Sequence, residues 1–322
     1  MKIRKTGALL IGVTLIGNLL AAQPAAAEED QEFFVGICQF VQHPALDAAT
    51  QGFMDALTEE FGDKVSFDLQ NAAGDTSTAT TICTNLVAEK VDLILANATP
   101  ALQTAAAATA DIPILGTSVT DYGVALELDD FDGVTGTNIS GTSDQVPFDS
   151  QAQMVMDLFP DAKTVGILYC SAEANSKFQA DAVEAKLTEL GADVEIYTFS
   201  DSNDVASVTG EACNNVDVLY IPTDNTAASC TEAINNVALP AGIPIIAGEE
   251  GIMAGCGVAT LSISYYELGR MTGEMAARVL NGEEVSSMPV EYQTDLVKEY
   301  NPSIAGELGV TIPDDYEAYE AE

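Results

Sequence analysis

The chain has 322 residues and a formal net charge of −39, because 50 Asp and Glu stand against 11 Lys and Arg. This excess of acid excludes nucleic acid as a partner, since phosphate binding needs basic patches, and it disfavours adhesion to anionic lipid. The hydrophobic fraction of 47% excludes a disordered acidic chain, and the length suggests about two domains.

The N-terminal segment has the pattern of a secretory signal. Three basic residues precede an apolar run from Ala8 to Ala22, which is followed by the small residues of Gln23–Ala27. We expect cleavage near Ala27 and export to the periplasm or the outer cell surface. No lipobox cysteine lies there, so we expect a soluble mature protein. The alternative is an uncleaved N-terminal anchor, and no second hydrophobic stretch of spanning length follows.

After this segment, short β-branched runs alternate with longer segments whose apolar residues recur at helical spacing. This βαβα order predicts parallel sheets in an α/β fold. The strands are expected at 33–39, 64–70, 91–97, 112–118, 163–169, 193–199, 216–222 and 243–248.

The two halves of the chain repeat one pattern. Three pairs of segments correspond in order: Val35–Ile37 with Val165–Ile167, Val91–Leu95 with Val216–Tyr220, and Ile112–Leu115 with Ile243–Ile246. The repeat predicts two doubly wound parallel-sheet lobes.

The segments after the second repeat are too few for a third domain, so we expect them to cross back between the lobes. A helix is predicted over Tyr265–Leu280, and 133–141 is expected to be the first crossing of a multi-strand hinge, about which the lobes open and close. The expected division is a signal peptide at 1–27, lobe 1 at 28–141 with about 262–288 returning to it, and lobe 2 at 142–261 with about 289–322 returning to it.

In open parallel sheets, ligands bind outside the carboxyl ends of the strands. The residues that follow the predicted strands are polar or aromatic, without Lys or Arg: Gln39, Phe40, His43, Thr99, Thr117, Ser118, Tyr169, Asn175, Thr223, Asp224, Asn225 and Glu249. This set suits a zwitterion better than a strong anion. Hydroxyls and the helix N-terminus expected at Thr99 would hold its carboxylate, Glu249 its ammonium, and Phe40 and Tyr169 an apolar part.

Each of these residues also has a plain structural interpretation. Glu249 could be a solvated surface acid, Thr99 a helix cap and Tyr169 a core residue, and Asn175 and Asn225 could serve turns. His43, the only histidine, either lines the cleft or merely precedes the helix that begins at Pro44.

Enzyme motifs are missing from the sequence. One histidine cannot supply a His-ligand metal cluster, no zinc-type cysteine spacing occurs, and no Gly-x-Gly-x-x-Gly, Walker or Gly-x-Ser-x-Gly motif is present. A Cys38–His43 nucleophile pair is conceivable on paper, but cysteines in exported proteins are more often disulfides. We therefore expect a binding protein with no catalytic residue, no metal and no cofactor.

The six cysteines divide evenly between the halves, with Cys38 and Cys83 in the first and Cys170, Cys213, Cys230 and Cys256 in the second. If pairing stays within a lobe, a Cys38–Cys83 disulfide follows. The alternative is that some of them are buried free thiols.

Five segments together resemble the tryptophan/tyrosine-type ABC transporter substrate-binding proteins with the type I periplasmic binding fold: Gln39–Asp47, Gly74–Ala79, Ala98–Ala101, Ile221–Thr226 and Tyr265–Gly269. The resemblance spans nearly all of the mature chain. It implies capture of an aromatic amino acid or a related compound and delivery to an ABC permease with a cytoplasmic ATPase. We expect a monomer. The chain departs from the family pattern at Gln42, Tyr122 and Glu249.

Two other functions fit the same lobes. A ligand-sensing binding protein would report to a membrane receptor instead of a permease, since fold alone does not fix the output. An exported α/β enzyme would change its ligand chemically.

Overall fold

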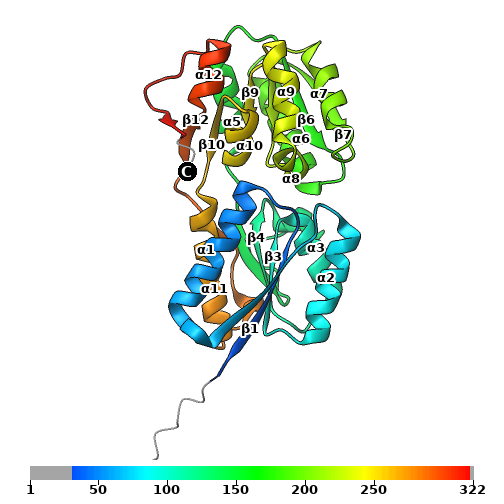
Figure 1. Ribbon diagram of the computed structural model, residues 1–322, viewed down its shortest axis with the longest axis vertical. Helices are drawn as coiled ribbons and strands as arrows, with labels where there is room; N and C mark the ends of the chain where they lie inside the picture. Colours follow the sequence, from blue (N-terminus) through cyan, green and yellow to red (C-terminus); the bar gives the residue numbers. More distant parts are fainter. Residues whose placement is uncertain (1–30, 320–322) are drawn as a thin grey trace, which may run out of the picture. The chain divides into compact units, whose positions relative to one another are not determined.

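The computed structural model describes residues 31–319, so the predicted signal segment lies outside the described residues. The strands of this region form two sheets (Figure 1). The first sheet has the order β11-β5-β4-β3-β1-β2 and consists of β1 (Phe33–Gln39), β2 (Val65–Asn71), β3 (Leu93–Asn97), β4 (Ile114–Val119), β5 (Ile139–Ser143) and β11 (Glu291–Tyr292). All of its neighbouring strands are parallel.

The second sheet has the order β13-β12-β10-β9-β8-β6-β7. It consists of β6 (Thr164–Cys170), β7 (Asp193–Phe199), β8 (Val218–Ile221), β9 (Ile245–Ala247), β10 (Ala259–Ser262), β12 (Val297–Tyr300) and β13 (Glu317–Ala318). Only β12 runs against its neighbour β10 among these described strands. The expectation of two doubly wound lobes is confirmed.

We call the first sheet and its helices lobe 1, and the second sheet and its helices lobe 2. Lobe 1 contains α1 (Pro44–Phe61), η1 (Gly62–Lys64), α2 (Thr76–Glu89), α3 (Thr99–Ala108), α4 (Tyr122–Ala125), α11 (Tyr265–Leu280) and η2 (Val285–Ser287). Lobe 2 contains α5 (Phe148–Leu158), α6 (Ala174–Glu189), α7 (Val205–Cys213), α8 (Asn225–Ser229), α9 (Thr231–Ala241), α10 (Glu250–Cys256) and α12 (Pro302–Leu308).

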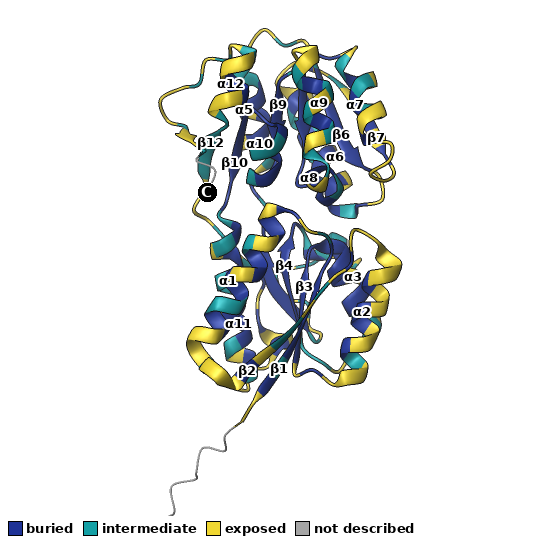
Figure 2. Cartoon of the chain, in the orientation of Figure 1, coloured by how far each residue is buried: buried dark blue, intermediate teal, exposed yellow. Residues whose placement is uncertain are grey.

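The eight strands predicted from the sequence are all present, with ends that differ by at most two residues, and the predicted helix Tyr265–Leu280 is α11. The central strands are buried on both faces because helices cover both sides of each sheet, as Figure 2 shows. Leu93–Asn97, for example, is buried at every position. Continuous apolar runs are therefore the correct signal for these strands.

The first crossing between the lobes was predicted wrongly. Residues 133–141 do not cross, because they lead into β5, which is the fifth parallel strand of lobe 1. The chain crosses at 144–147, between β5 and α5. A side chain at Gly141 would overlap with the backbone of Gly116, and the Gly141 φ of +143° favours glycine. The glycine and the serines of β5 interrupt the continuous apolar run by which the other central strands are recognised.

Helices α1 and α11 pack side by side on lobe 1 (Figure 1). Their backbones touch because the contact is made of glycines: a methyl group at Gly52 would overlap with the carbonyl of Tyr266, and one at Gly269 with the carbonyl of Ala49. These positions have ordinary helical backbone, so close packing is what requires glycine here.

The six cysteines, all in the described region, are free thiols. The expected Cys38–Cys83 disulfide is not formed, although both side chains are fully buried in one core cluster of lobe 1. A hydrogen bond from Cys83 and burial raise the pKa of Cys38 far above its ordinary value. The alternative of buried free thiols describes this structure.

Candidate binding cleft

The carboxyl ends of the strands of both lobes face a common cavity. Its lining residues are His43, Leu46, Ser118, Thr120, Asp144, Asn175, Thr223, Asp224, Asn225, Ala228, Glu249 and Tyr265. No Lys or Arg is among them. The cavity has a volume of about 10 Å³, which is room for about one water molecule.

Hydrogen bonds cross between the lobes at this cavity. The side-chain amide of Gln179 on α6 donates to the hydroxyl of Thr120, which follows β4, over 3.0 Å and also to the hydroxyl of Thr223. The hydroxyls of Thr120 and Thr223 are 3.4 Å apart. His43 Nε2 lies 3.3 Å from Asn225 Oδ1. The two lobes are therefore in a closed arrangement.

A second, larger cavity of about 150 Å³ lies beside the first, also between the lobes. Lobe 1 contributes an apolar wall of Phe40, Val41 and Pro100, together with the loop from Ala73 to Thr76. Lobe 2 contributes polar groups, which include Glu173 and Ser200–Ser202. This cavity combines an apolar wall with a polar one.

Buried polar atoms without a hydrogen-bond partner gather in this region. In residues 31–319, six of the seven such side-chain atoms belong to residues at or soon after the carboxyl ends of strands: His43 Nδ1, Asn97 Oδ1, Thr99 Oγ1, Ser118 Oγ, Asp144 Oδ1 and Asn175 Oδ1. Four of these residues, His43, Ser118, Asp144 and Asn175, line the first cavity. Buried polar groups are normally paired, so such a cluster needs an explanation. A polar ligand held between the lobes would supply the missing partners.

The three lining carboxylates differ in their partners. Asp224 is the N-cap of α8 and accepts from the amides of Cys170 at 2.6 Å and Ala227 at 2.7 Å. Glu249 is the N-cap of α10 and accepts from two amides of that helix. Asp144 accepts from the Tyr265 hydroxyl over 2.9 Å through Oδ2 only.

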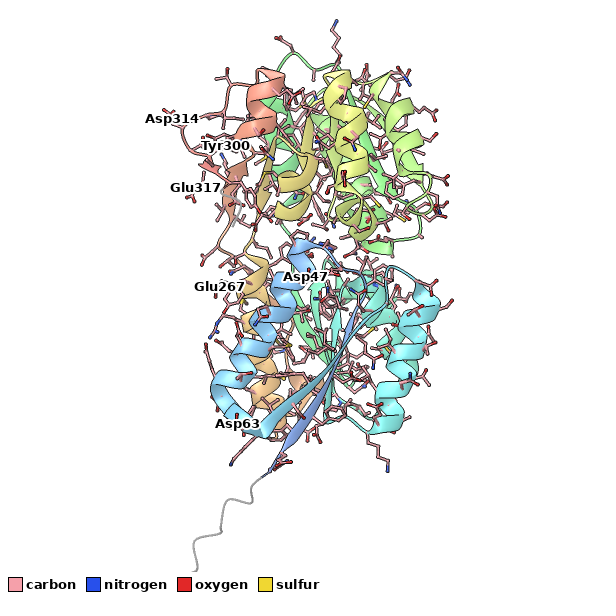
Figure 3. The ribbon with its side chains drawn as sticks, viewed as in Figure 1. Asp47, Asp63, Glu267, Tyr300, Asp314 and Glu317 are labelled. Atoms are coloured by element: carbon pink, nitrogen blue, oxygen red, sulfur yellow. The ribbon has the colours of Figure 1, made fainter. Side chains whose placement is uncertain are left out.

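Burial raises the pKa of all three carboxyls. For Glu249 the pKa rises to about 7 in spite of its two amide hydrogen bonds. For Asp224, burial and the neighbouring Glu173 carboxylate raise the pKa. The pKa of Asp144 is also raised by burial, and the nearby hydroxyls of Tyr265 and Thr120 oppose this rise. Exposed acids such as Asp63, Asp314 and Glu317 lie at the surface instead (Figure 3).

His43 is neutral at physiological pH. Burial lowers its pKa to about 4, which outweighs the hydrogen bond to Asn225 and the charge of Asp47. Asp47 lies in the first turn of α1 and is exposed (Figure 3). A neutral imidazole at the cleft can donate from one ring nitrogen and accept at the other.

Ser118 has an unusual backbone conformation. Its φ is +55°, which is uncommon for a residue with a side chain and occurs where the surroundings fix it. The residue is buried, lines the first cavity, and its hydroxyl has no partner among the described residues.

The structure brings most of the sequence-predicted residues together. The first cavity is lined by His43, Ser118, Asn175, Thr223, Asp224, Asn225 and Glu249, and the second by Phe40. Thr99 is buried at the start of α3 with an unpartnered hydroxyl. It is not the helix cap that the sequence suggested, because Ala98 holds that position.

Four predicted residues do not line either cavity: Thr99, and also Gln39, Thr117 and Tyr169. Gln39 bonds Asp47 and Thr50 and so holds α1 against β1. Thr117 lies 3.4 Å from the hydroxyl of Thr142. Tyr169 belongs to the core cluster of lobe 2, which was the alternative interpretation from the sequence.

Three polar residues that line the first cavity were missed: Thr120, Asp144 and Tyr265. Asp144 directly follows β5, so the same strand-end rule would have found it if β5 had been predicted. Thr120 follows β4 by one residue. Tyr265 is the first residue of α11, and nothing in its local sequence indicates that it reaches Asp144.

The described region offers neither a metal site nor a membrane span. Within residues 31–319, no group of three His, Cys, Asp or Glu side chains could hold a metal ion. No helix there is long and apolar enough to cross a bilayer.

Two parallel-sheet lobes closed on a cleft of strand-end residues define a type I periplasmic binding protein. The family model of the ABC transporter substrate binding proteins matches residues 34–322, and the chain belongs to this family. It is therefore the extracytoplasmic, small-molecule-binding component of an ABC transporter, whose partner is a permease.

Similar proteins come from several bacteria. A tyrosine-binding protein of Clostridioides difficile (strain R20291) is 39% identical over 262 residues, which cover 80% of this chain and 75% of that protein. The crystal structure of an ABC domain in complex with L-Trp from Streptococcus pneumoniae is 35% identical, with a TM-score of 0.85 and coverage of 88% of this chain and 97% of that chain. A conserved domain protein of Vibrio cholerae is 30% identical, with a TM-score of 0.86 and coverage of 89% and 99%.

A further relative bears on the closed arrangement. The ligand-free, open structure of a Clostridium difficile substrate binding protein with adhesive properties is 39% identical, covers 90% of this chain and 100% of that chain, and has a TM-score of only 0.68. Its sequence is more similar than that of the L-Trp complex, yet its structure is less similar. An open arrangement differs from the arrangement of this chain, in which hydrogen bonds cross the cleft.

Proposed function

We propose that the protein captures an aromatic amino acid between its lobes and delivers it to an ABC permease with a cytoplasmic ATPase. The observation that carries this proposal is the cluster of unpartnered, buried polar atoms at the facing strand ends, four of which belong to residues that line the first cavity. The cluster offers hydroxyls, an amide oxygen, a neutral imidazole and a carboxylate, and the lining contains no basic side chain. This donor and acceptor set fits a small zwitterion.

The carboxylate of the ligand would lie at lobe 1. The hydroxyls of Ser118 and Thr99 are unpartnered there, and α3 begins at Thr99 with the unpaired amides and the positive dipole end that favour an anion. No Lys or Arg is needed for such a site.

The aromatic side chain would occupy the second cavity, against Phe40. The wall of Phe40, Val41 and Pro100 offers apolar contact, and the polar wall of lobe 2 offers partners for a phenol hydroxyl or an indole N–H. The names of the similar tyrosine-binding protein and of the L-Trp complex support this ligand class.

In the present arrangement the first cavity is too small for an amino acid, since ligand pockets usually span about 300–1,000 Å³. Binding therefore requires the lobes to separate and to close again around the ligand. We propose that residues 1–27 direct export, with cleavage near Ala27, and that the mature protein is a monomer.

Calorimetric titration of the protein from which residues 1–27 have been removed tests the proposal. L-Tyrosine, L-tryptophan, L-phenylalanine, L-leucine and ribose should be compared, and we expect binding of the aromatic amino acids only. Ser118→Ala should weaken binding, whereas Ser207→Ala, at an exposed position of α7, should not. Binding of ribose without any amino acid would refute the proposal.

A further inference from the structure

We infer that the Asp144 carboxylate selects ligands that carry a cationic nitrogen. Through its second oxygen, Asp144 also links that nitrogen to Tyr265, beside another segment that crosses between the lobes. The inference deepens the proposed function and rests on it for the ligand class. The sequence suggested that Glu249 binds the ammonium group of the ligand. The inference assigns this group to Asp144 instead.

Asp144 lies where the chain leaves lobe 1. It is the first residue after β5, in the crossing segment 144–147, and only 4% of it is exposed. The backbone amide of Asp144 donates to the carbonyl of Val119 over 3.3 Å, which fixes the residue against the end of β4.

The Oδ1 atom of Asp144 lacks a partner among the residues that the structure describes, and Asp144 lines the first cavity. A buried carboxylate oxygen without a partner is unfavourable. Because the lining contains no Lys or Arg, the cation that would satisfy this oxygen has to arrive with the ligand.

The other lining carboxylates are already used. Asp224 holds the amides of Cys170 and Ala227, one with each oxygen. Glu249 holds the amides of Gly251 at 2.6 Å and Ile252 at 2.5 Å, again one with each oxygen. Asp144 is thus the lining acid with an oxygen to spare.

The other oxygen of Asp144 forms a hydrogen bond between two segments at which the chain crosses from one lobe to the other. Oδ2 accepts from the hydroxyl of Tyr265, the first residue of α11, and α11 begins directly after the chain has returned from β10 of lobe 2. A cation at Oδ1 keeps the carboxyl ionised, and a hydrogen bond to an ionised acceptor is stronger than one to a neutral acceptor. Ligand binding therefore strengthens the Asp144–Tyr265 bond between the crossing segments.

The raised pKa of Asp144 agrees with this role. Burial favours the protonated carboxyl in the closed cleft. A nearby cation has the opposite effect on a carboxyl. The other titratable groups in the lining are His43, Asp224, Glu249 and Tyr265, and none of them is a cation at neutral pH.

The test compares three ligands that differ in charged groups: L-tryptophan, indolepropionate without the amine, and tryptamine without the carboxylate. In the unaltered protein, we expect L-tryptophan to bind at least about 30-fold more tightly than indolepropionate, since loss of one partner of a buried charge pair has an effect of this size. Equal affinities would overturn the inference without any need for a variant.

Asp144→Asn keeps the size of the side chain and removes its charge. We expect it to weaken L-tryptophan at least about 30-fold and to leave indolepropionate nearly unchanged, so that the preference for the amine disappears. Tyr265→Phe removes the bond that the cation strengthens, so it should weaken L-tryptophan by a small factor, more than indolepropionate, and reduce the preference for the amine without abolishing it. Asp63→Asn, at an exposed position, is the control and should change nothing.

The outcomes separate this inference from the proposed function. If L-tryptophan binds and Asp144→Asn retains the preference for the amine, Asp144 is not the selecting residue and the proposed function stands. Binding of tryptamine but not L-tryptophan, with loss in Asp144→Asn, would overturn the zwitterionic ligand and support Asp144. Failure of every amine to bind overturns both.

Discussion

The side-chain amide of Gln179 in lobe 2 donates to the hydroxyl of Thr120 in lobe 1 over 3.0 Å. This bond can exist only while the lobes are together. With the His43–Asn225 contact, it stabilises the closed arrangement relative to an open one.

Replacement of Gln179 by Ala should therefore lower ligand affinity. Loss of the bond to Thr120, which exists only while the lobes are closed, should cost about 1.4 kcal/mol, which corresponds to about a tenfold higher Kd, mostly through faster dissociation. Calorimetry and stopped-flow fluorescence would measure both. Gln153→Ala, on the exposed side of α5, is the matched control, and an equal loss in that variant would contradict this explanation.

The glycine contact between α1 and α11 predicts a loss of stability. Gly269→Ala places a methyl group against the backbone of Ala49, and such overpacking typically costs about 1–3 kcal/mol. The control is Gly306→Ala in α12, where no atom lies near the new methyl. That change should be neutral or stabilising by up to about 1 kcal/mol, since alanine favours the helix. Urea unfolding would measure both changes, and equal effects would argue against the close contact.

The buried acids predict how stability depends on pH. The pKa of Glu249 is about 7 in the folded protein against an ordinary value of 4.5, so the folded protein holds a proton there that the unfolded chain has lost. Its stabilising effect is fully present below pH 4.5 and is lost as the pH rises through about 7. We expect Glu249→Gln to flatten the decline in unfolding free energy over this interval, by at most about 1.4 kcal/mol per pH unit.

Glu267→Gln, on the exposed side of α11 (Figure 3), is the control for that experiment. His43 acts in the opposite direction. Its pKa is lowered from 6.5 to about 4, so the unfolded chain binds the extra proton and His43 reduces stability as the pH falls below 6.5. A stability curve that rises steadily from pH 4 to pH 8 would contradict the assignment of raised pKa values to the acids.

The free thiols predict a two-stage reaction with a thiol reagent. Cys213 and Cys230 are partly exposed and should react in the folded protein, whereas Cys38, Cys83, Cys170 and Cys256 are buried and should react only after unfolding. Titration in denaturant without reductant should count six thiols. A count of four would mean that one disulfide has formed.

The sequence predicted the architecture well because its signals are local. Runs such as Leu93–Ala96 are continuously apolar, and the repeat of the first unit in the second indicates two lobes. The strand β5 was not predicted because four of its five residues, Ser140–Ser143, are small or polar, and β11 and β13 are only two residues each. The misplaced crossing at 133–141 follows directly from the missing β5.

The sequence could predict only those cleft residues that follow the carboxyl end of a predicted strand. His43, Ser118 and Asn225 follow predicted elements and were found. Asp144 was lost with β5, and Tyr265 acts through a hydrogen bond over 121 positions of sequence, which no local pattern shows. The charge of Glu249 suggested that its carboxylate would be available to bind a ligand ammonium. In the structure the carboxylate caps α10, which depends on the backbone conformation at the start of that helix and is not visible in the sequence.

The glycine contact between α1 and α11 also restricts how the lobes can separate. Because the two backbones touch at Gly52 and Gly269, we expect α1 and α11 to move together, with His43 just before α1 and Tyr265 at the start of α11. We therefore expect lobe 1 to move as one body when the lobes separate. Rotation about the backbone torsions of the few residues that link β5 to α5, β10 to α11 and β11 to β12 would then account for the movement.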